Sequence, residues 1–210
     1  MTMVLAMDTT GSAPAMALLH GDDVLASWQG DTAQTPLGNG LRAVVAGRNL
    51  PLRELRGRLT TVAGAMGPGR YARLRAGVAF AKGLATGLGV PFVGVRSAAA
   101  VARAAGGHRG PIVIPAGRGR VYCWTGGQGA PPTPAIGAPE LAAQLGAGVT
   151  VAGDVDDGTA EGILAAGLRL QRIQPVEVAY AVGCLAGERD PSIVGVEVAR
   201  PIYMPAAGHG

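Results

Sequence analysis

The stretch that most constrains the fold runs from residue 65 to residue 91, AMGPGRYARLRAGVAFAKGLATGLGVP. A predicted strand, LTTVAGAMG, ends in a Gly-Pro-Gly turn, and a helix is predicted over about residues 70–89, before the strand VPFVGV. Apolar residues in this helix recur at spacings of three and four, which is typical of a helix with one buried face. A second row holds only small residues and would let another helix approach closely: Ala72, Ala76, Ala79, Gly83 and Gly87.

The rest of the chain also reads as strands and helices, which predicts an α/β protein. Aromatic residues make up only 4% of the 210 residues, so the core must be built from small aliphatic side chains. The first half opens with a predicted three-stranded meander, and the second half repeats the scheme more loosely. We therefore expect two lobes, residues 1–106 and 107–210. A further helix is predicted for TPLGNGLRAVVAGRN, with four aliphatic residues on one side: Leu37, Leu41, Val44 and Val45.

The charge of the chain is unevenly distributed. Residues 1–105 hold eleven Lys or Arg and five acids, a balance of +6, whereas residues 106–210 hold seven and nine, a balance of −2. Such a field can attract nucleic acid or an acidic protein, although a solvated basic surface is the alternative. Two cysteines suggest no disulfide framework, and no signal peptide or run of about twenty apolar residues is visible. We expect a soluble, cytoplasmic protein.

A metal site or a His-dependent hydrolase is not expected from the histidines. The chain has three, His20, His108 and His209, and none has a second His or an acid at helical ligand spacing. An acidic loop, GDVDDG, contains Asp154, Asp156 and Asp157 but lacks the spacing of a calcium-binding loop. We interpret this loop as a solvated turn.

Two places in the sequence could contact a nucleotide or another anion. Asp8 and Thr9 follow a predicted strand, where an acid either meets a ligand or bonds its own turn, and the second interpretation is favoured. The Gly-Pro-Gly turn could present N–H groups of Gly67 and Gly69 at a helix start, with Arg75 nearby. However, Pro68 has no N–H, and the stretch lacks the lysine and the spacing of a P-loop. The spacing therefore does not favour a phosphate site here.

Four motifs together resemble the TsaB (YeaZ) family, a bacterial subunit of tRNA threonylcarbamoyladenosine biosynthesis. They are MDTTGSAPAMALL, GAMGPGRYARLRAGVAFAKGLATGLGVPFVGV, GRGRVY and the terminal PIYM. The family shows GPGSFTGLRIG before a helix of small residues. This chain keeps six positions of that pattern: Gly67, Pro68, Gly69, Leu74, Arg75 and Gly77. It departs from the family at Arg70, Ala72 and Arg73, where Ser, Thr and Gly are usual, and at residues 115–120.

The resemblance implies a two-lobed actin/Hsp70/sugar-kinase-like (ASKHA) fold, each lobe a mixed sheet with flanking helices. It implies a noncatalytic partner of TsaD, with TsaE as a third component, in the modification of the adenosine at position 37 of ANN-decoding tRNAs. ATP and metal are then expected on TsaD and no cofactor on this chain. TsaD, or a second copy of the chain, would meet the two helices described above: Leu37, Leu41, Val44 and Val45 with Ala72, Ala76, Ala79, Gly83 and Gly87.

Two other classes of function remain open. The first is an ATP-binding kinase or ATPase of the same fold, using Asp8 and the loop from Gly67 to Gly69. The second is an RNA-binding module that uses a basic cluster, whose members are Arg42, Arg48, Arg53, Arg56, Arg58, Arg70, Arg73 and Arg75.

Overall fold

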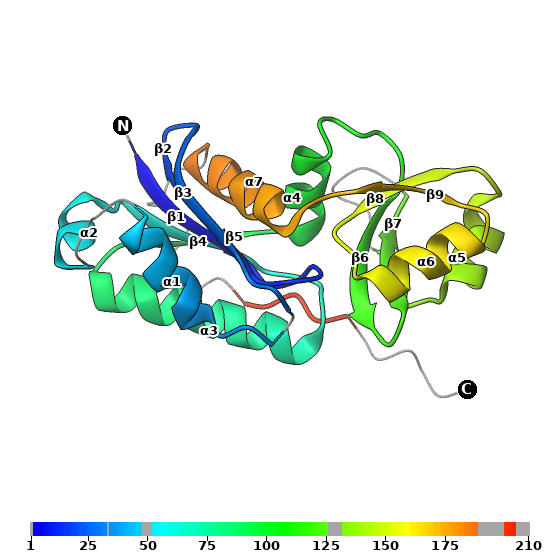
Figure 1. The fold of residues 1–210 in the computed structure, drawn as a ribbon, viewed down its shortest axis with the longest axis horizontal. Coiled ribbons are helices and arrows are strands. Elements are labelled where there is room, and N and C mark those ends of the chain that lie inside the picture. Colours follow the sequence, from blue (N-terminus) through cyan, green and yellow to red (C-terminus); the bar gives the residue numbers. More distant parts are fainter. Residues whose placement is uncertain (1, 33, 48–51, 126–131, 189–199, 205–210) are drawn as a thin grey trace.

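Two mixed sheets with flanking helices form the protein (Figure 1). The computed structural model describes residues 2–32, 34–47, 52–125, 132–188 and 200–204. The first sheet has the strand order β3-β2-β1-β4-β5, with β1, β2 and β3 antiparallel and β1, β4 and β5 parallel. Its strands are β1 (Met3–Asp8), β2 (Ala15–His20), β3 (Asp23–Gln29), β4 (Thr61–Ala65) and β5 (Phe92–Val95).

Helices cover both faces of the first sheet, as the alternation of side chains along β1 requires. Leu5 and Met7 share a core with the helices on one face, whereas Val4 and Ala6 belong to the core on the other. The helices on the Leu5 side are α1 (Leu37–Ala46), α2 (Leu52–Arg58) and α3 (Tyr71–Leu88). Those on the Val4 side are α4 (Ser97–Ala104) and α7 (Pro175–Gly187).

The second sheet has the order β7-β6-β8-β9 and is covered by helices on both faces. One face packs on α5 and α6, and the other face packs on α4 (Figure 1). Its elements are β6 (Ile112–Gly117), β7 (Arg120–Trp124), α5 (Ala138–Leu145), β8 (Thr150–Gly153), α6 (Asp157–Ala165) and β9 (Arg169–Arg172).

The predicted architecture of two lobes, each a mixed sheet with flanking helices, is confirmed, but the second half of the chain does not stay in the second lobe. The second sheet lies within residues 112–172, whereas α7 returns to pack on β1 and β2. The segment 200–204 also reaches the first lobe, where the Ile202 amide donates to the Met66 carbonyl at 2.7 Å. The predicted second lobe, residues 107–210, therefore needs this correction. In the part of the chain that the structure describes, no helix is long and apolar enough to cross a membrane.

Candidate functional site

The solvent face of α3 carries only short side chains along most of its length. Leu74, Val78 and Ala81 are buried against the first sheet, as their spacing predicts. The row of small residues lies on the opposite, exposed side of the helix: Ala72, Ala76, Ala79, Gly83 and Gly87. A Cβ added at Gly83 or Gly87 would meet no atom within 4 Å. We call this row the small-residue face.

Helix α1 borders the small-residue face and contributes aliphatic side chains that are partly covered. Leu37, Leu41 and Val45 are half-buried and pack at the edge of the core beneath α1 and α3. Val44 was expected at the same partner surface, but its side chain is fully buried. It faces the sheet because it follows Gly40 by one helical turn, and Gly40 lies directly over Trp28. Val44 therefore belongs to the core, which corrects the expectation.

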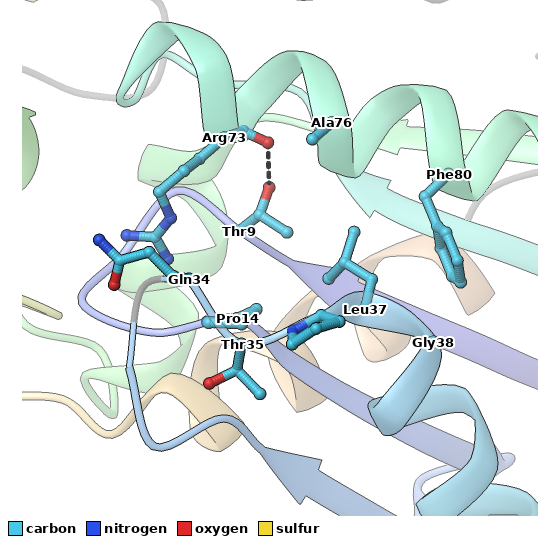
Figure 2. Close-up of a pocket in the computed structure, with 10 residues that line it drawn as sticks. Thr9, Pro14, Gln34, Thr35, Leu37, Gly38, Arg73, Ala76 and Phe80 are labelled. Carbon is cyan, nitrogen blue, oxygen red and sulfur yellow. Dashed lines mark hydrogen bonds between the residues drawn. The ribbon is translucent and has the colours of Figure 1, made fainter.

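A pocket of about 370 Å³ opens between the start of α1 and the middle of α3 (Figure 2). Leu37, Ala76 and Phe80 form its apolar part, while Gln34 and Arg73 supply polar groups. Phe80 and Gln34 were not among the predicted site residues, because neither belongs to the row of small residues or to the aliphatic row of α1. The pocket gives the helical surface a concave end that could accept a side chain.

The strand-end acid Asp8 is bonded to its own turn. Its Oδ1 accepts hydrogen bonds from the amide of Thr10 (3.1 Å) and from the hydroxyl of Thr10 (2.7 Å), and its Oδ2 accepts one from the Gly11 amide (3.3 Å). Burial raises the pKa of Asp8 above its ordinary value, although the hydrogen bonds from Thr10 act in the opposite direction. Thr9 donates through Oγ1 to the Arg73 carbonyl at 3.1 Å. Asp8 thus bonds its own turn, which is the interpretation that the sequence favours.

The glycines of the Gly-Pro-Gly turn serve close packing. The Gly67 amide donates to Ser97 Oγ at 3.1 Å, and Gly67 has a φ of 95°, a conformation that favours glycine. A Cβ at Gly69 would lie 2.8 Å from the Cβ of Thr10, so no larger residue fits there without a shift. Arg75 lies on the surface, where its Nη1 donates to the Tyr71 hydroxyl at 3.0 Å. The five residues suggested for anion binding thus do not converge on one point.

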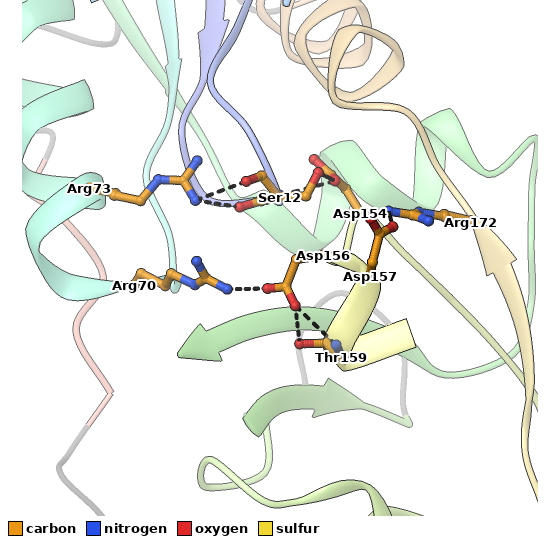
Figure 3. A network of polar contacts seen from close by, with 9 residues as sticks. Ser12, Arg70, Arg73, Asp154, Asp156, Asp157, Thr159 and Arg172 are labelled. Carbon is orange, nitrogen blue, oxygen red and sulfur yellow. Dashed lines mark hydrogen bonds and ion pairs between the residues drawn. The ribbon is translucent and has the colours of Figure 1, made fainter. Parts of the chain in front are cut away.

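The acidic loop joins the two lobes, so its interpretation as a solvated turn is wrong for Asp154. Only 2% of Asp154 is exposed, and its Oδ1 accepts hydrogen bonds from the Ser12 amide (3.0 Å) and the Ser12 hydroxyl (Figure 3). No hydrogen-bond partner within the described part of the chain reaches its Oδ2. Burial raises the pKa of Asp154 to about 7, with the neighbouring Asp8 adding to the increase while Ser12 and Arg73 oppose it.

Two arginines at the start of α3 complete this junction. Arg73 Nη1 donates to the Gly11 carbonyl (2.8 Å) and the Ser12 carbonyl (3.3 Å), and Arg70 forms an ion pair with Asp156. Asp156 also caps α6, because its Oδ1 accepts from the Thr159 amide at 3.0 Å. These are two of the positions at which the chain departs from the TsaB pattern.

Further charged residues of the predicted sites lie at the border of this junction or outside the described residues. Asp157 is exposed and pairs with Arg172 at 2.7 Å. Arg48 of the predicted basic cluster and His209 fall outside the described residues. Within the described ranges, no group of three or more His, Cys, Asp or Glu residues is arranged to hold a metal ion.

Comparisons with known proteins agree with this architecture. The model of a family described as TsaD, tRNA N6-adenosine threonylcarbamoyltransferase, matches residues 54–129. YeaZ from Pseudomonas aeruginosa superposes with a TM-score of 0.68 and 20% identity, covering 97% of this chain and 100% of that chain. A second structure is that of an uncharacterized protein with similarity to peptidase YEAZ from Pseudomonas aeruginosa. It superposes with a TM-score of 0.66 and 22% identity, covering 97% of this chain and 99% of that chain.

The comparison with curated proteins gives no match. Because the two solved structures share only about one-fifth of their residues with this chain, they establish its fold alone. The matched segment 54–129 includes all of α3 and therefore the whole small-residue face. The chain thus has the fold of YeaZ, and the YeaZ structures together with the TsaD-family match support its resemblance to the TsaB family.

Proposed function

We propose that this chain is a TsaB-type, noncatalytic subunit that binds TsaD and supports the formation of threonylcarbamoyladenosine at position 37 of ANN-decoding tRNAs. The observation that carries the proposal is the small-residue face of α3, exposed beside the half-buried aliphatic residues of α1. The TsaD-family match to residues 54–129 and the YeaZ-like fold support it.

The chemistry of this surface suits a helix of a partner. Side chains at the contact set the distance between packed helices, so alanine and glycine allow the two backbones to come close. Close approach increases the number of dispersion contacts along the helix. Leu37, Leu41 and Val45 would add hydrophobic burial at one border, and the pocket beside Phe80 would receive one partner side chain. In the absence of TsaD, a second copy could use the same surface.

In this proposal the chain itself binds no cofactor, and TsaD carries ATP and the metal, with TsaE as a third component. The arrangement around Asp8 supports that division. Both carboxylate oxygens of Asp8 accept hydrogen bonds from its own turn, and the Gly67 amide is bonded to Ser97. In the alternative, a kinase or ATPase using Asp8 and the Gly67–Gly69 loop, the Gly67 amide would have to leave Ser97 before it could donate to a phosphate.

Reconstitution tests the proposal. TsaD and TsaE from the same organism are incubated with the threonylcarbamoyl donor and an unmodified ANN-decoding tRNA, with and without this chain, and the modified nucleoside is quantified. We expect product only when the chain is present, and calorimetry should show no ATP binding by the isolated chain, with or without magnesium. Full activity of TsaD without the chain, or ATP turnover by the isolated chain, would contradict the proposal.

A further inference from the structure

Two exposed tyrosines from distant parts of the sequence meet at the first turn of α3. The ring centroids of Tyr71 and Tyr203 are 5.1 Å apart, and the planes are inclined by 44°. The guanidinium carbon of Arg75 lies 5.3 Å from the centroid of Tyr71. We propose that Tyr71, Tyr203 and Arg75, here called the tyrosine platform, bind single-stranded RNA by stacking of unpaired bases. The inference rests on the proposed role in tRNA modification for the choice of RNA.

The side chains of Tyr71 and Tyr203 are exposed, and the packing of the fold does not depend on them. Tyr71 is 60% exposed and Tyr203 is 47% exposed, so a large part of both aromatic rings faces solvent. The segment that carries Tyr203 is already fixed by Ile202, which bonds to the Met66 carbonyl at 2.7 Å and packs against the core. The tyrosine pair is therefore not needed to hold the segment in place. Arg75 covers part of the Tyr71 ring, and the exposed remainder of the two rings is suited to stacking on a base.

Arg75 is the cation that the structure places at the platform, with its guanidinium over the Tyr71 ring. It belongs to a basic stretch of the sequence, residues 55–139, which contains eleven Lys or Arg and no Asp or Glu. Arg70 is paired with Asp156, and Arg73 donates to carbonyls of the loop after β1, so both serve the lobe junction. Arg75 instead lies over the exposed Tyr71 ring, where its cation can approach a phosphate.

The platform favours unpaired RNA over a duplex. Bases in an A-form duplex are stacked within the helix, whereas bases in loops can be splayed onto aromatic side chains and arginine planes. The platform also lies apart from the α1 border of the small-residue face. Arg73, Ala76 and Phe80 line the pocket beside α1, and the 3.6-residue helical period places Tyr71 and Arg75 on roughly the other side of α3. RNA at the platform would therefore leave the pocket beside α1 open to TsaD.

Binding of a fluorescent 12-nucleotide single-stranded RNA to the isolated full chain tests the inference, with a duplex of the same length as comparison. Combining Tyr71→Ala with Tyr203→Ala should weaken binding by about tenfold, within the range for loss of one stacked base. The matched Tyr203→Phe variant keeps both rings and the Tyr71 hydroxyl that accepts from Arg75, and it should bind as the unchanged chain does. Arg75→Ala should lower the salt dependence by about 0.7 in the log–log slope, whereas Arg42→Ala on α1 should not.

The same measurements can overturn the inference. Unchanged RNA binding by the double alanine variant, with a thermal midpoint equal to that of the unchanged chain, would do so. Duplex RNA bound as tightly as the single strand would also contradict it. If the double alanine variant loses TsaD but keeps RNA binding, the rings belong to a protein contact and the inference is wrong. Because RNA binding is measured without TsaD, a failure of the proposed TsaD role would not be mistaken for a failure here.

Discussion

The first turn of α3 and its small-residue face lie on one helix but behave as opposite kinds of surface. At the first turn, Arg70 and Arg73 bond to Asp156 and to the loop after β1, so the helix is tied to the second lobe. At Gly83, three turns further on, an added Cβ would touch nothing within 4 Å. The difference indicates that α3 is anchored at its first turn and open to solvent along its exposed side.

The largest difference in stability is expected between substitution of a buried glycine of α3 and substitution of an exposed one. A Cβ at Gly77 would lie 2.1 Å from Thr9 Oγ1, so Gly77→Ala should lower the free energy of unfolding by up to about 3 kcal/mol. Gly83→Ala is the matched control, and it should be neutral or gain up to about 1 kcal/mol because alanine favours a helix. Urea unfolding measures both. Equal effects of the two substitutions would remove the distinction between the two sides of the helix.

The buried carboxylate of the junction should make stability depend on pH. The pKa of Asp154 is raised to about 7 in the folded protein, mainly by burial, from an ordinary value of 3.8. Between these values the folded state binds more protons than the unfolded state, so stability falls as pH rises from 4 to 7. Asp154→Asn should remove this loss and raise the free energy of unfolding at pH 8 by more than about 1.4 kcal/mol, the equivalent of one pKa unit.

The pH experiment has an internal control in Asp8. Its pKa is also raised by burial, so the part of the pH dependence that Asp8 causes should persist in the Asp154→Asn variant. Asn can still accept both hydrogen bonds from Ser12 through its amide oxygen. Chemical unfolding at pH 5 and pH 8 gives the comparison. The same pH dependence in the variant and in the unchanged chain would show that Asp154 is not the group responsible.

The ion pair at the first turn should have a smaller effect. Asp156→Ala removes both the cap of α6 and the pair with Arg70, and it should cost about 1–2 kcal/mol. Asp156→Asn keeps a capping oxygen and should cost less, because only the charge is lost. Asp157→Ala breaks an exposed pair with Arg172 and should stay within about 0.5 kcal/mol. Thermal unfolding of the three variants separates these contributions, and the reverse ranking would contradict the assigned contacts.

The sequence predicts the parts of the fold that depend on local patterns. The spacing of Leu74 and Val78 placed the buried side of α3 correctly, and the three-stranded meander was confirmed. Strand β9, RLQR, was missed because it has a single apolar residue and no alternating pattern. Helix α2, LRELRGR, is short and also escaped prediction. The sequence also did not predict that α7 packs on the first sheet, because the apolar content of a helix does not say which sheet it covers.

The lobe junction could not be predicted because its partners are far apart in sequence. Ser12 and Asp154 are separated by 142 positions, and Arg70 and Asp156 by 86. Three nearby aspartates without metal-ligand spacing indicate a solvated turn only when no other segment covers them. Val44 was misplaced for a related reason, since adjacent helix positions are 100° apart and the pattern alone did not separate it from Val45.

The most direct test of the account is co-purification of TsaD from the same organism with Gly83→Leu and Ala76→Trp. Both add bulk to the small-residue face, and Leu164→Trp adds bulk at another exposed site, on α6, as the control. We predict that Gly83→Leu and Ala76→Trp lose TsaD while keeping the thermal midpoint of the unchanged chain, and that Leu164→Trp retains TsaD. Undiminished recovery of TsaD with both α3 variants would contradict the central claim that this face is the docking surface.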